Sequence, residues 1–189
     1  MTLLEASDIR ISRRAYIPEL ISDEKKEELQ KVIADICSRS GLRIELMEDG
    51  ENCFSLIKSY GMFSGVKSYF ALIGNSDDPK MHEKIGYYGE ELVLQATRLG
   101  LGTCWVAGSY DKGSVALSLG EKEALACVIS VGEIRGSENL KEKFLSGIIK
   151  TKRKSPQEMS IGYDSAPEWF KKGVESAMLC PTAINQQKF

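Results

Sequence analysis

Apolar residues recur at helical spacing in two long stretches of the chain. The first stretch begins after Ser22, a favourable N-cap residue, and ends at Gly41, a favourable C-cap residue. Its apolar face carries Leu29, Val32, Ile33, Ile36 and Cys37. The second stretch ends at Gly100-Leu101-Gly102, and its apolar face carries Ile85, Tyr88, Leu92, Ala96 and Leu99. This spacing predicts two amphipathic α-helices that each bury one face.

Other stretches have the pattern of β-strands. Arg43–Met47 alternates polar and apolar residues, whereas 67–74 and 125–134 are nearly continuous apolar runs. We expect shorter helical segments at 3–14, at 120–124 and after Pro167. In the last of these, the residues expected to pack are Trp169, Phe170, Ala177 and Cys180. Helices that separate the strands predict an α/β or α+β fold, with a mixed sheet flanked by helices.

The composition is that of a single globular domain. The 189 residues are 42% hydrophobic and 28% charged, so we expect one domain over 1–189. A net charge of −2 does not favour non-specific binding of nucleic acid. No apolar run reaches the roughly 20 residues that cross a bilayer, and the first residues do not have the pattern of a signal peptide. We therefore expect a cytoplasmic protein with neither a nucleic-acid nor a membrane partner.

Few side chains of this sequence are suited to carry chemistry by themselves. The five cysteines include no pair at CxxC spacing, which argues against a disulfide framework and a zinc site, and we expect no metal. His82 is the only histidine, and its polar surroundings predict a solvated loop residue. We interpret Cys104, beside Trp105, as a small packed residue. The chemistry is therefore expected to come from an organic cofactor.

Two basic clusters are candidates for binding an anion. One contains Arg10, Ser12, Arg13 and Arg14, and the other occupies 150–154. Guanidinium and hydroxyl groups suit a phosphate, but taken alone each cluster is more simply interpreted as a solvated basic turn. Neither cluster resembles a P-loop or a Rossmann glycine motif, and both motifs are absent from the sequence.

Two further stretches have features of a ligand site. The segment 102–108 begins and ends with glycine, and glycine lets the backbone approach a flat ligand closely. An ordinary core helix with a glycine cap explains the preceding helix but explains this segment less well. Near the end, a helix stops at Pro181, and hydroxyl and amide side chains follow up to Gln187. This stretch is either a hydrogen-bonding elbow or a plain loop.

Together these stretches resemble the nitroreductase family of FMN flavoproteins. Arg10-x-Ser12-x-Arg14-x-Tyr16 matches the family's opening R-x-S-x-R-x-(F/Y) motif, and 86–108 is similar to its long central helix with a GLGTCW exit. Ile129-Ser130-Val131-Gly132 resembles the family's last core strand, and Lys152-Arg153-Lys154-Ser155-Pro156 resembles its late basic motif. Pro181-Thr182-x-x-Asn185-x-Gln187 resembles its P-S-x-x-N-x-Q-P elbow. The resemblance covers most of the chain and implies a nitroreductase-like fold that binds FMN.

The resemblance implies which residues bind the phosphate end of FMN. Arg10 and Arg153, helped by Lys152, would bind the phosphate itself. Ile11 and Ser12 would line the ribityl chain.

The resemblance also implies which residues surround the flavin ring. Arg14 would lie near the pyrimidine edge, where positive charge stabilises the anionic reduced form. Backbone groups of Ala107 and Gly108 would face N5. The residues that would cover the ring from the other side are Pro181, Thr182 and Asn185. In relatives, this elbow comes from the partner subunit of a homodimer.

The elbow departs from the usual family pattern. In typical members it follows the first long helix, where this chain has 37–41, and Lys188 replaces its final proline. The late placement resembles a branch in which two related halves share one chain, and 27–46 and 168–189 echo each other weakly. We therefore expect a homodimer or a single-chain pseudo-dimer. The chain stops soon after the elbow, which leaves the family's C-terminal strand and helix unaccounted for.

The resemblance implies an FMN-dependent oxidoreductase. NADH or NADPH would pass hydride to N5 of the flavin, and a small acceptor such as a nitroaromatic or a quinone would then take the electrons, with no catalytic side chain required. Two alternatives stay open. One is a flavin-binding storage or sensor protein without turnover, and the other is a flavin-free interaction domain.

Overall fold

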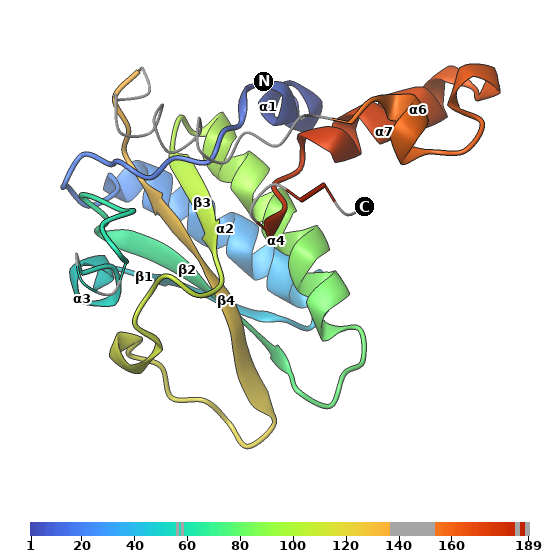
Figure 1. Cartoon of the computed structure of the whole chain (residues 1–189). Coiled ribbons are helices and arrows are strands. Elements are labelled where there is room, and N and C mark those ends of the chain that lie inside the picture. Colours follow the sequence, from blue (N-terminus) through green and yellow to red (C-terminus); the bar gives the residue numbers. More distant parts are fainter. Residues whose placement is uncertain (56, 58, 137–153, 184–185, 188–189) are drawn as a thin grey trace.

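One four-stranded sheet forms the centre of the molecule (Figure 1). The structure is a computed structural model that describes residues 1–55, 57, 59–136, 154–183 and 186–187. The sheet order is β1-β2-β4-β3, with β1 (Arg43–Met47), β2 (Ser68–Asn75), β3 (Gly102–Val106) and β4 (Glu123–Gly132). All the pairs are antiparallel, and among the described residues the parallel component consists of isolated bridges such as Ser12 with Thr103. The expected α/β class is confirmed.

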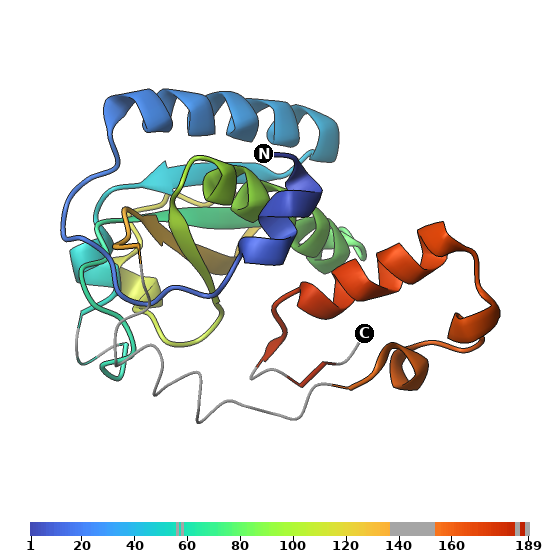
Figure 2. The same ribbon diagram turned by 90° about the horizontal axis from the view of Figure 1, so that it is seen from above.

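Two long helices cover one face of the sheet, as Figure 2 shows for α2. They are α2 (Asp23–Ser40) and α4 (Met81–Arg98), the helices that the apolar spacing predicts. Gly41 ends α2 with a φ of 71°, in the left-handed region that favours glycine. The buried side chains between sheet and helices include Leu29, Ile36, Phe70, Leu72, Leu92 and Ile129.

Loops and short helices cover the opposite face. They include α3 (Gly50–Cys53) and the 3₁₀ turn η1 (Lys112–Ser114). The strand residues that face this second layer are Tyr69, Ala71, Cys104, Val106 and Val128. Because β2 is buried on both faces, its sequence is a continuous apolar run instead of an alternation.

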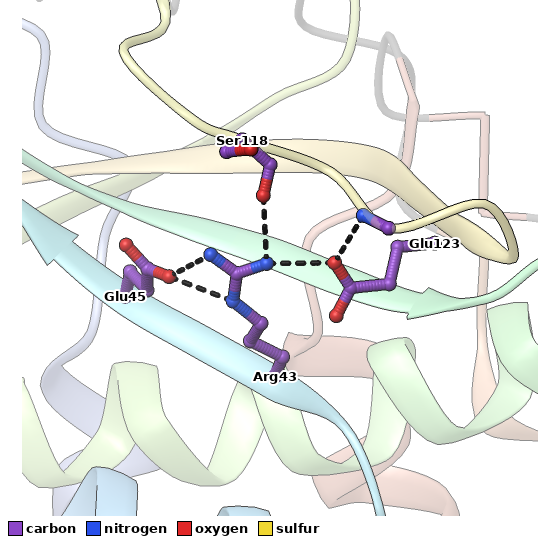
Figure 3. Close-up of polar contacts among 5 residues, drawn as sticks. Arg43, Glu45, Ser118 and Glu123 are labelled. Atoms are coloured by element: carbon purple, nitrogen blue, oxygen red, sulfur yellow. Dashed lines mark hydrogen bonds and ion pairs between the residues drawn. The ribbon is translucent and has the colours of Figure 1, made fainter.

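An arginine on the edge strand β1 forms hydrogen bonds and ion pairs with residues at and before the start of β4 (Figure 3). Nη1 of Arg43 donates to the carbonyl of Ser118 at 3.1 Å and to Glu123 Oε2 at 2.7 Å. Nε of Arg43 donates to Glu45 Oε1 at 2.7 Å, and Nη2 reaches the same oxygen. The N–H of Gly120 donates to Glu123, and this hydrogen bond is the main reason why the pKa of the Glu123 carboxyl is lowered. The hydrogen bond from Arg43 lowers that pKa further. The network ties β1 to the turn that precedes β4.

The last part of the described chain, 154–183 and 186–187, forms a C-terminal arm that Figure 2 shows extending from the body. It contains α6 (Pro156–Met159), the 3₁₀ turn η2 (Tyr163–Ser165) and α7 (Glu168–Leu179), and α7 contacts α1 (Leu3–Ile9). No residue of α7 is buried, and Trp169 is 75% exposed. The expected packing is therefore wrong for Trp169 and Cys180, which are exposed because no described element covers the outer face of α7, whereas Phe170 and Ala177 are half-buried.

Three local expectations are also corrected. The opening helix ends at Ile9 and not at residue 14, because the next residues run beside β3, where the N–H of Arg13 donates to the carbonyl of Thr103 at 2.8 Å. The 120–124 segment is a turn followed by the start of β4. His82 is exposed, but it lies in the first turn of α4 and not in a loop. Within the described residues, no helix is long and apolar enough to cross a membrane.

Candidate functional site

Arg10 lies where the opening motif meets the end of the C-terminal arm. Its own N–H donates to the carbonyl of Ala6 at 2.9 Å and closes α1. Its Nη2 donates to the carbonyl of Leu179, the last residue of α7, also at 2.9 Å. The side chain of Arg10 is only 9% exposed. The first expected phosphate ligand is thus placed directly beside the expected elbow.

Glu90 of α4 supplies the counter-charge of Arg10. Its Oε1 lies 3.4 Å from Arg10 Nε, and its side chain is 18% exposed. Its other oxygen, Oε2, accepts a hydrogen bond of 2.8 Å from the indole Nε1 of Trp105 on β3. Arg10, Glu90 and Trp105 therefore connect the opening segment, the central helix and the sheet.

A glycine allows Trp105 to reach this position. A Cβ on Gly89 would lie 2.4 Å from Cη2 of Trp105 and 2.8 Å from a methyl carbon of Leu72. No real side chain fits at those distances, so the indole packs directly against the backbone of α4. The sequence Gly89-Glu90 thereby combines a close contact with the ring and an acceptor for its N–H.

The surroundings of Glu90 disfavour its charged form. Burial raises the pKa of the Glu90 carboxyl above its ordinary value, while the charge of Arg10 and the N–H of Trp105 act in the opposite direction. Burial also raises the pKa of the nearby Cys180 thiol, and the charge of Glu90 adds to that effect. Both pKa shifts are in the direction that favours the neutral form.

A cavity of about 300 Å³ lies between α1, α4 and α7, beside this pair. Its walls are mostly apolar, and Arg10 and Glu90 form its charged part. The other lining residues are Leu3, Leu4, Ser7, Leu94, Ser176, Ala177, Leu179 and Cys180. The described part of the chain contains no group of three or more His, Cys, Asp or Glu that could hold a metal ion.

The other residues of the opening motif lie along β3. Ile11 is 43% exposed, and Ser12 is half-buried in its bridge to Thr103. Arg14 is half-buried, whereas Arg13 is buried and donates from Nη2 to the carbonyl of Arg135 at 3.1 Å. Of the three arginines, Arg13 is thus an internal residue of the fold.

The segment after β3 presents an exposed backbone. Ala107 and Gly108 follow the last strand residue, Val106, and both are exposed. A Cβ on Gly108 would meet nothing within 4 Å, so the space beside it is open. The run of mostly buried β3 residues therefore ends where the resemblance expects the flavin ring.

Gln187 brings the elbow and the late basic motif together. It is buried, its Oε1 accepts from the N–H of Lys154 at 3.1 Å, and its own N–H donates to Thr182 Oγ1 at 3.0 Å. Pro181 and Thr182 are half-buried. Lys154 precedes Ser155, the N-cap residue of α6. The remaining expected ligands lie outside the described residues: Lys152, Arg153 and Asn185.

Glu90 and Trp105 are site residues that the sequence did not single out. Glu90 has an identical neighbour, Glu91, which pairs instead with Arg39 at 2.6 Å. No local pattern distinguishes a glutamate that faces Arg10 from one that faces Arg39. The helical face shared with Gly89 is the nearest available signal.

Comparison with known proteins shows the family. The family model described as "Putative TM nitroreductase" matches residues 2–189. The chain belongs to this nitroreductase family. No curated protein matches the sequence.

Solved structures with this fold include three relatives of different description. A "putative nitroreductase" from Thermotoga maritima has a TM-score of 0.65 and 20% identity, and the match covers 99% of this chain and 69% of that one. A "putative nitroreductase in complex with fmn" from Desulfovibrio desulfuricans has a TM-score of 0.55 and 19% identity, covering 76% and 95%. A "Putative NADH Oxidase" from Clostridium acetobutylicum has a TM-score of 0.58 and 20% identity, covering 84% and 98%. At these identities the likeness establishes the common fold.

Proposed function

We propose that this nitroreductase-family protein is an FMN-dependent oxidoreductase that passes electrons from NADH or NADPH to a small acceptor, such as a nitroaromatic or a quinone. The family, the FMN complex of the Desulfovibrio relative and the NADH oxidase description of the Clostridium relative support this proposal. Bound FMN would supply the reducible group, with hydride received at N5. The chain's own residues would bind the flavin, orient it and keep its ring accessible.

The position of Arg10 is the observation that carries the proposal. A phosphate ligand needs a fixed guanidinium with N–H groups to spare. Arg10 is fixed by Glu90 and by the carbonyl of Leu179, and a guanidinium has five N–H groups. The N–H groups of Arg10 that have no acceptor among the described residues therefore fit a phosphate. Lys152 and Arg153 are proposed to complete the anion site.

The other roles follow the order of residues along the site. Ile11 and Ser12, beside β3, are proposed to line the ribityl chain, and Arg14 to lie at the pyrimidine edge. The exposed backbone at Ala107 and Gly108 supports a position next to N5. The residues proposed to cover the ring are Pro181, Thr182 and Asn185.

The contact between Arg10 and Leu179 within one chain supports an elbow that serves its own subunit. The proposal accordingly includes a single-chain pseudo-dimer as the unit that binds FMN, with a homodimer as the alternative. Static light scattering of the flavin-loaded protein distinguishes a monomer from a dimer.

The visible spectrum of the purified protein tests the main proposal. We expect a yellow protein, or one that turns yellow with added FMN, whose flavin absorbance bleaches with NADH or NADPH under anaerobic conditions and returns with a quinone. A colourless protein that ignores FMN would exclude both flavin functions. A flavin that binds but does not bleach with either nicotinamide would indicate a storage or sensor protein.

The phosphate assignment has its own test. Arg10→Ala together with Arg153→Ala should release FMN, because the two guanidinium groups are proposed to bind the phosphate. Equilibrium dialysis measures the FMN affinity, and riboflavin, which lacks the phosphate, is the control ligand. Unchanged FMN affinity in the double variant would contradict the assignment.

A further inference from the structure

The proposed phosphate ligand already has a carboxylate beside it. Arg10 and Glu90 are 9% and 18% exposed, so little water screens their interaction. As a pair they are neutral, and a phosphate bound to Arg10 would bring its negative charge next to the charge of Glu90. Lys152 and Arg153 are proposed to bind the same phosphate, but the carboxylate of Glu90 would still lie next to it where little water screens the repulsion, and a proton on Glu90 removes that repulsion.

The guanidinium does not need to leave Glu90 in order to bind an anion. Nε faces Glu90 and Nη2 donates once to the carbonyl of Leu179. Within the described part of the chain, the other N–H groups of Arg10 have no protein acceptor. An incoming phosphate can therefore use these donors while Glu90 stays in place, so the conflict is one of charge and not of space.

Resting on the proposed FMN site, we propose that Glu90 is the resident counter-ion of Arg10 and that the phosphate binds together with one proton taken up by Glu90. The proton comes from solvent and adds to a carboxylate oxygen, with no other bond formed or broken. Trp105 donates to Oε2 and Nε of Arg10 faces Oε1, so each oxygen keeps a lone pair that can receive the proton. The neutral carboxyl then has one O–H donor.

Few other groups compete for this role. In the described residues, the charged or titratable groups that act on Glu90 come from two neighbouring segments: Arg10 after α1, and the Cys180 thiol after α7. The strand β3 contributes the indole of Trp105 next to Glu90, and this group is uncharged. Burial raises the pKa of both Glu90 and Cys180, but Cys180 is already neutral below its ordinary pKa. Glu90 is therefore the group whose charge can change when an anion arrives.

The test compares FMN with riboflavin, because their affinity ratio isolates the contribution of the phosphate. Fluorescence titrations in phosphate-free buffers, between about pH 6 and about pH 8, would use the wild type, Glu90→Gln and the control Glu91→Gln. The carboxamide introduced by Glu90→Gln keeps an acceptor for Trp105 but has no charge. We expect the FMN-to-riboflavin ratio of Glu90→Gln to exceed that of the wild type by about tenfold near pH 8, with the difference shrinking as pH falls. Glu91→Gln should behave as the wild type, because Glu91 pairs with Arg39.

Calorimetry of the unaltered protein provides a second readout that does not depend on a variant. Near pH 8, where the phosphate of FMN is already doubly ionised, titration with FMN in two buffers of different ionisation enthalpy should show net proton uptake, and titration with riboflavin should not. A ratio unchanged or lowered in Glu90→Gln, or FMN binding without proton uptake, would overturn the inference while the flavin site stands. A wild type that binds neither flavin would contradict the proposed function, and the inference with it.

Discussion

Two arginines of this chain, Arg43 and Arg10, are each held by carboxylate and carbonyl oxygens, yet their surroundings differ. Arg43 has a 37% exposed side chain and donates to Glu45, Glu123 and the carbonyl of Ser118 (Figure 3). Arg10 has a 9% exposed side chain, one carboxylate partner and one carbonyl acceptor. Two carboxylates outweigh the charge of Arg43, whereas Arg10 and its partner are balanced.

The difference separates a structural arginine from one suited to a ligand. Nε and both Nη groups of Arg43 are engaged, and a further anion would meet excess negative charge. Arg10 lies beside a cavity and has unused N–H groups toward the described residues. The two sites both contain an arginine, and they differ in how many of its N–H groups already have an acceptor.

Replacing each arginine by alanine should give the largest contrast. Arg10→Ala leaves Glu90 without its partner in a buried site, and we expect the free energy of unfolding to fall by about 3 kcal/mol near neutral pH. Arg43→Ala breaks pairs that water screens, so its effect should be much smaller. Urea unfolding of both variants measures the difference. Equal losses would show that burial does not separate the two networks.

The removal of the indole donor of Trp105 should have the next largest effect. Trp105→Phe keeps an aromatic ring but removes the N–H that donates to Glu90, and we expect a loss of about 2 kcal/mol in stability. Part of this loss reflects the smaller ring. The double variant Trp105→Phe with Glu90→Ala isolates the hydrogen bond through a mutant cycle, because each single variant removes one of its partners. Strictly additive losses would mean that the indole stabilises the fold by packing alone.

Much of the fold was predictable because its signals are local. Ser22, the apolar face of α2 and Gly41 all lie in one continuous stretch, and the structure has the helix there. β3 was not foreseen as a strand. Its five residues, Gly102–Val106, carry no alternation of their own, and their extended form depends on pairing with β4, which is distant in sequence.

The site divides in the same way. Arg10 was identified because its motif is a short run of residues, and Gln187 because it belongs to the elbow. Glu90 was missed because its role depends on two partners, Arg10 and Trp105, that only the folded chain brings to it. Likewise, the helical spacing of α7 suggested burial of Trp169, but the existence of a covering element cannot be read from that spacing.

The pH dependence of stability should sharpen the contrast between the two arginines. Burial holds the folded-state pKa of Glu90 above its unfolded value, so its stabilising contribution is complete below the unfolded pKa and is lost as pH rises through the folded pKa. Arg10 opposes that shift, and Arg10→Ala should therefore lose about 1 kcal/mol more stability near pH 8 than near pH 5. Adding Glu90→Gln should abolish the extra slope. Arg43→Ala should show no such difference between about pH 5 and about pH 8, because the lowered pKa of Glu123 keeps that carboxylate charged over this range, and its loss should shrink only in stronger acid.

The smallest effect is expected where neither arginine acts, at the junction of elbow and basic motif. Thr182→Val keeps the shape of the side chain but removes the acceptor for the N–H of Gln187, whose carboxamide accepts from Lys154. Because no residue of α7, the main helix of the C-terminal arm, is buried, we expect the free energy of unfolding to change by less than about 1 kcal/mol. Hydrogen exchange should nevertheless quicken at the amides of Gln187 and Lys154 and remain unchanged at β2. Unaltered exchange at both arm amides would show that Gln187 does not join the two motifs in solution, and the elbow would then have to reach the flavin site by another contact.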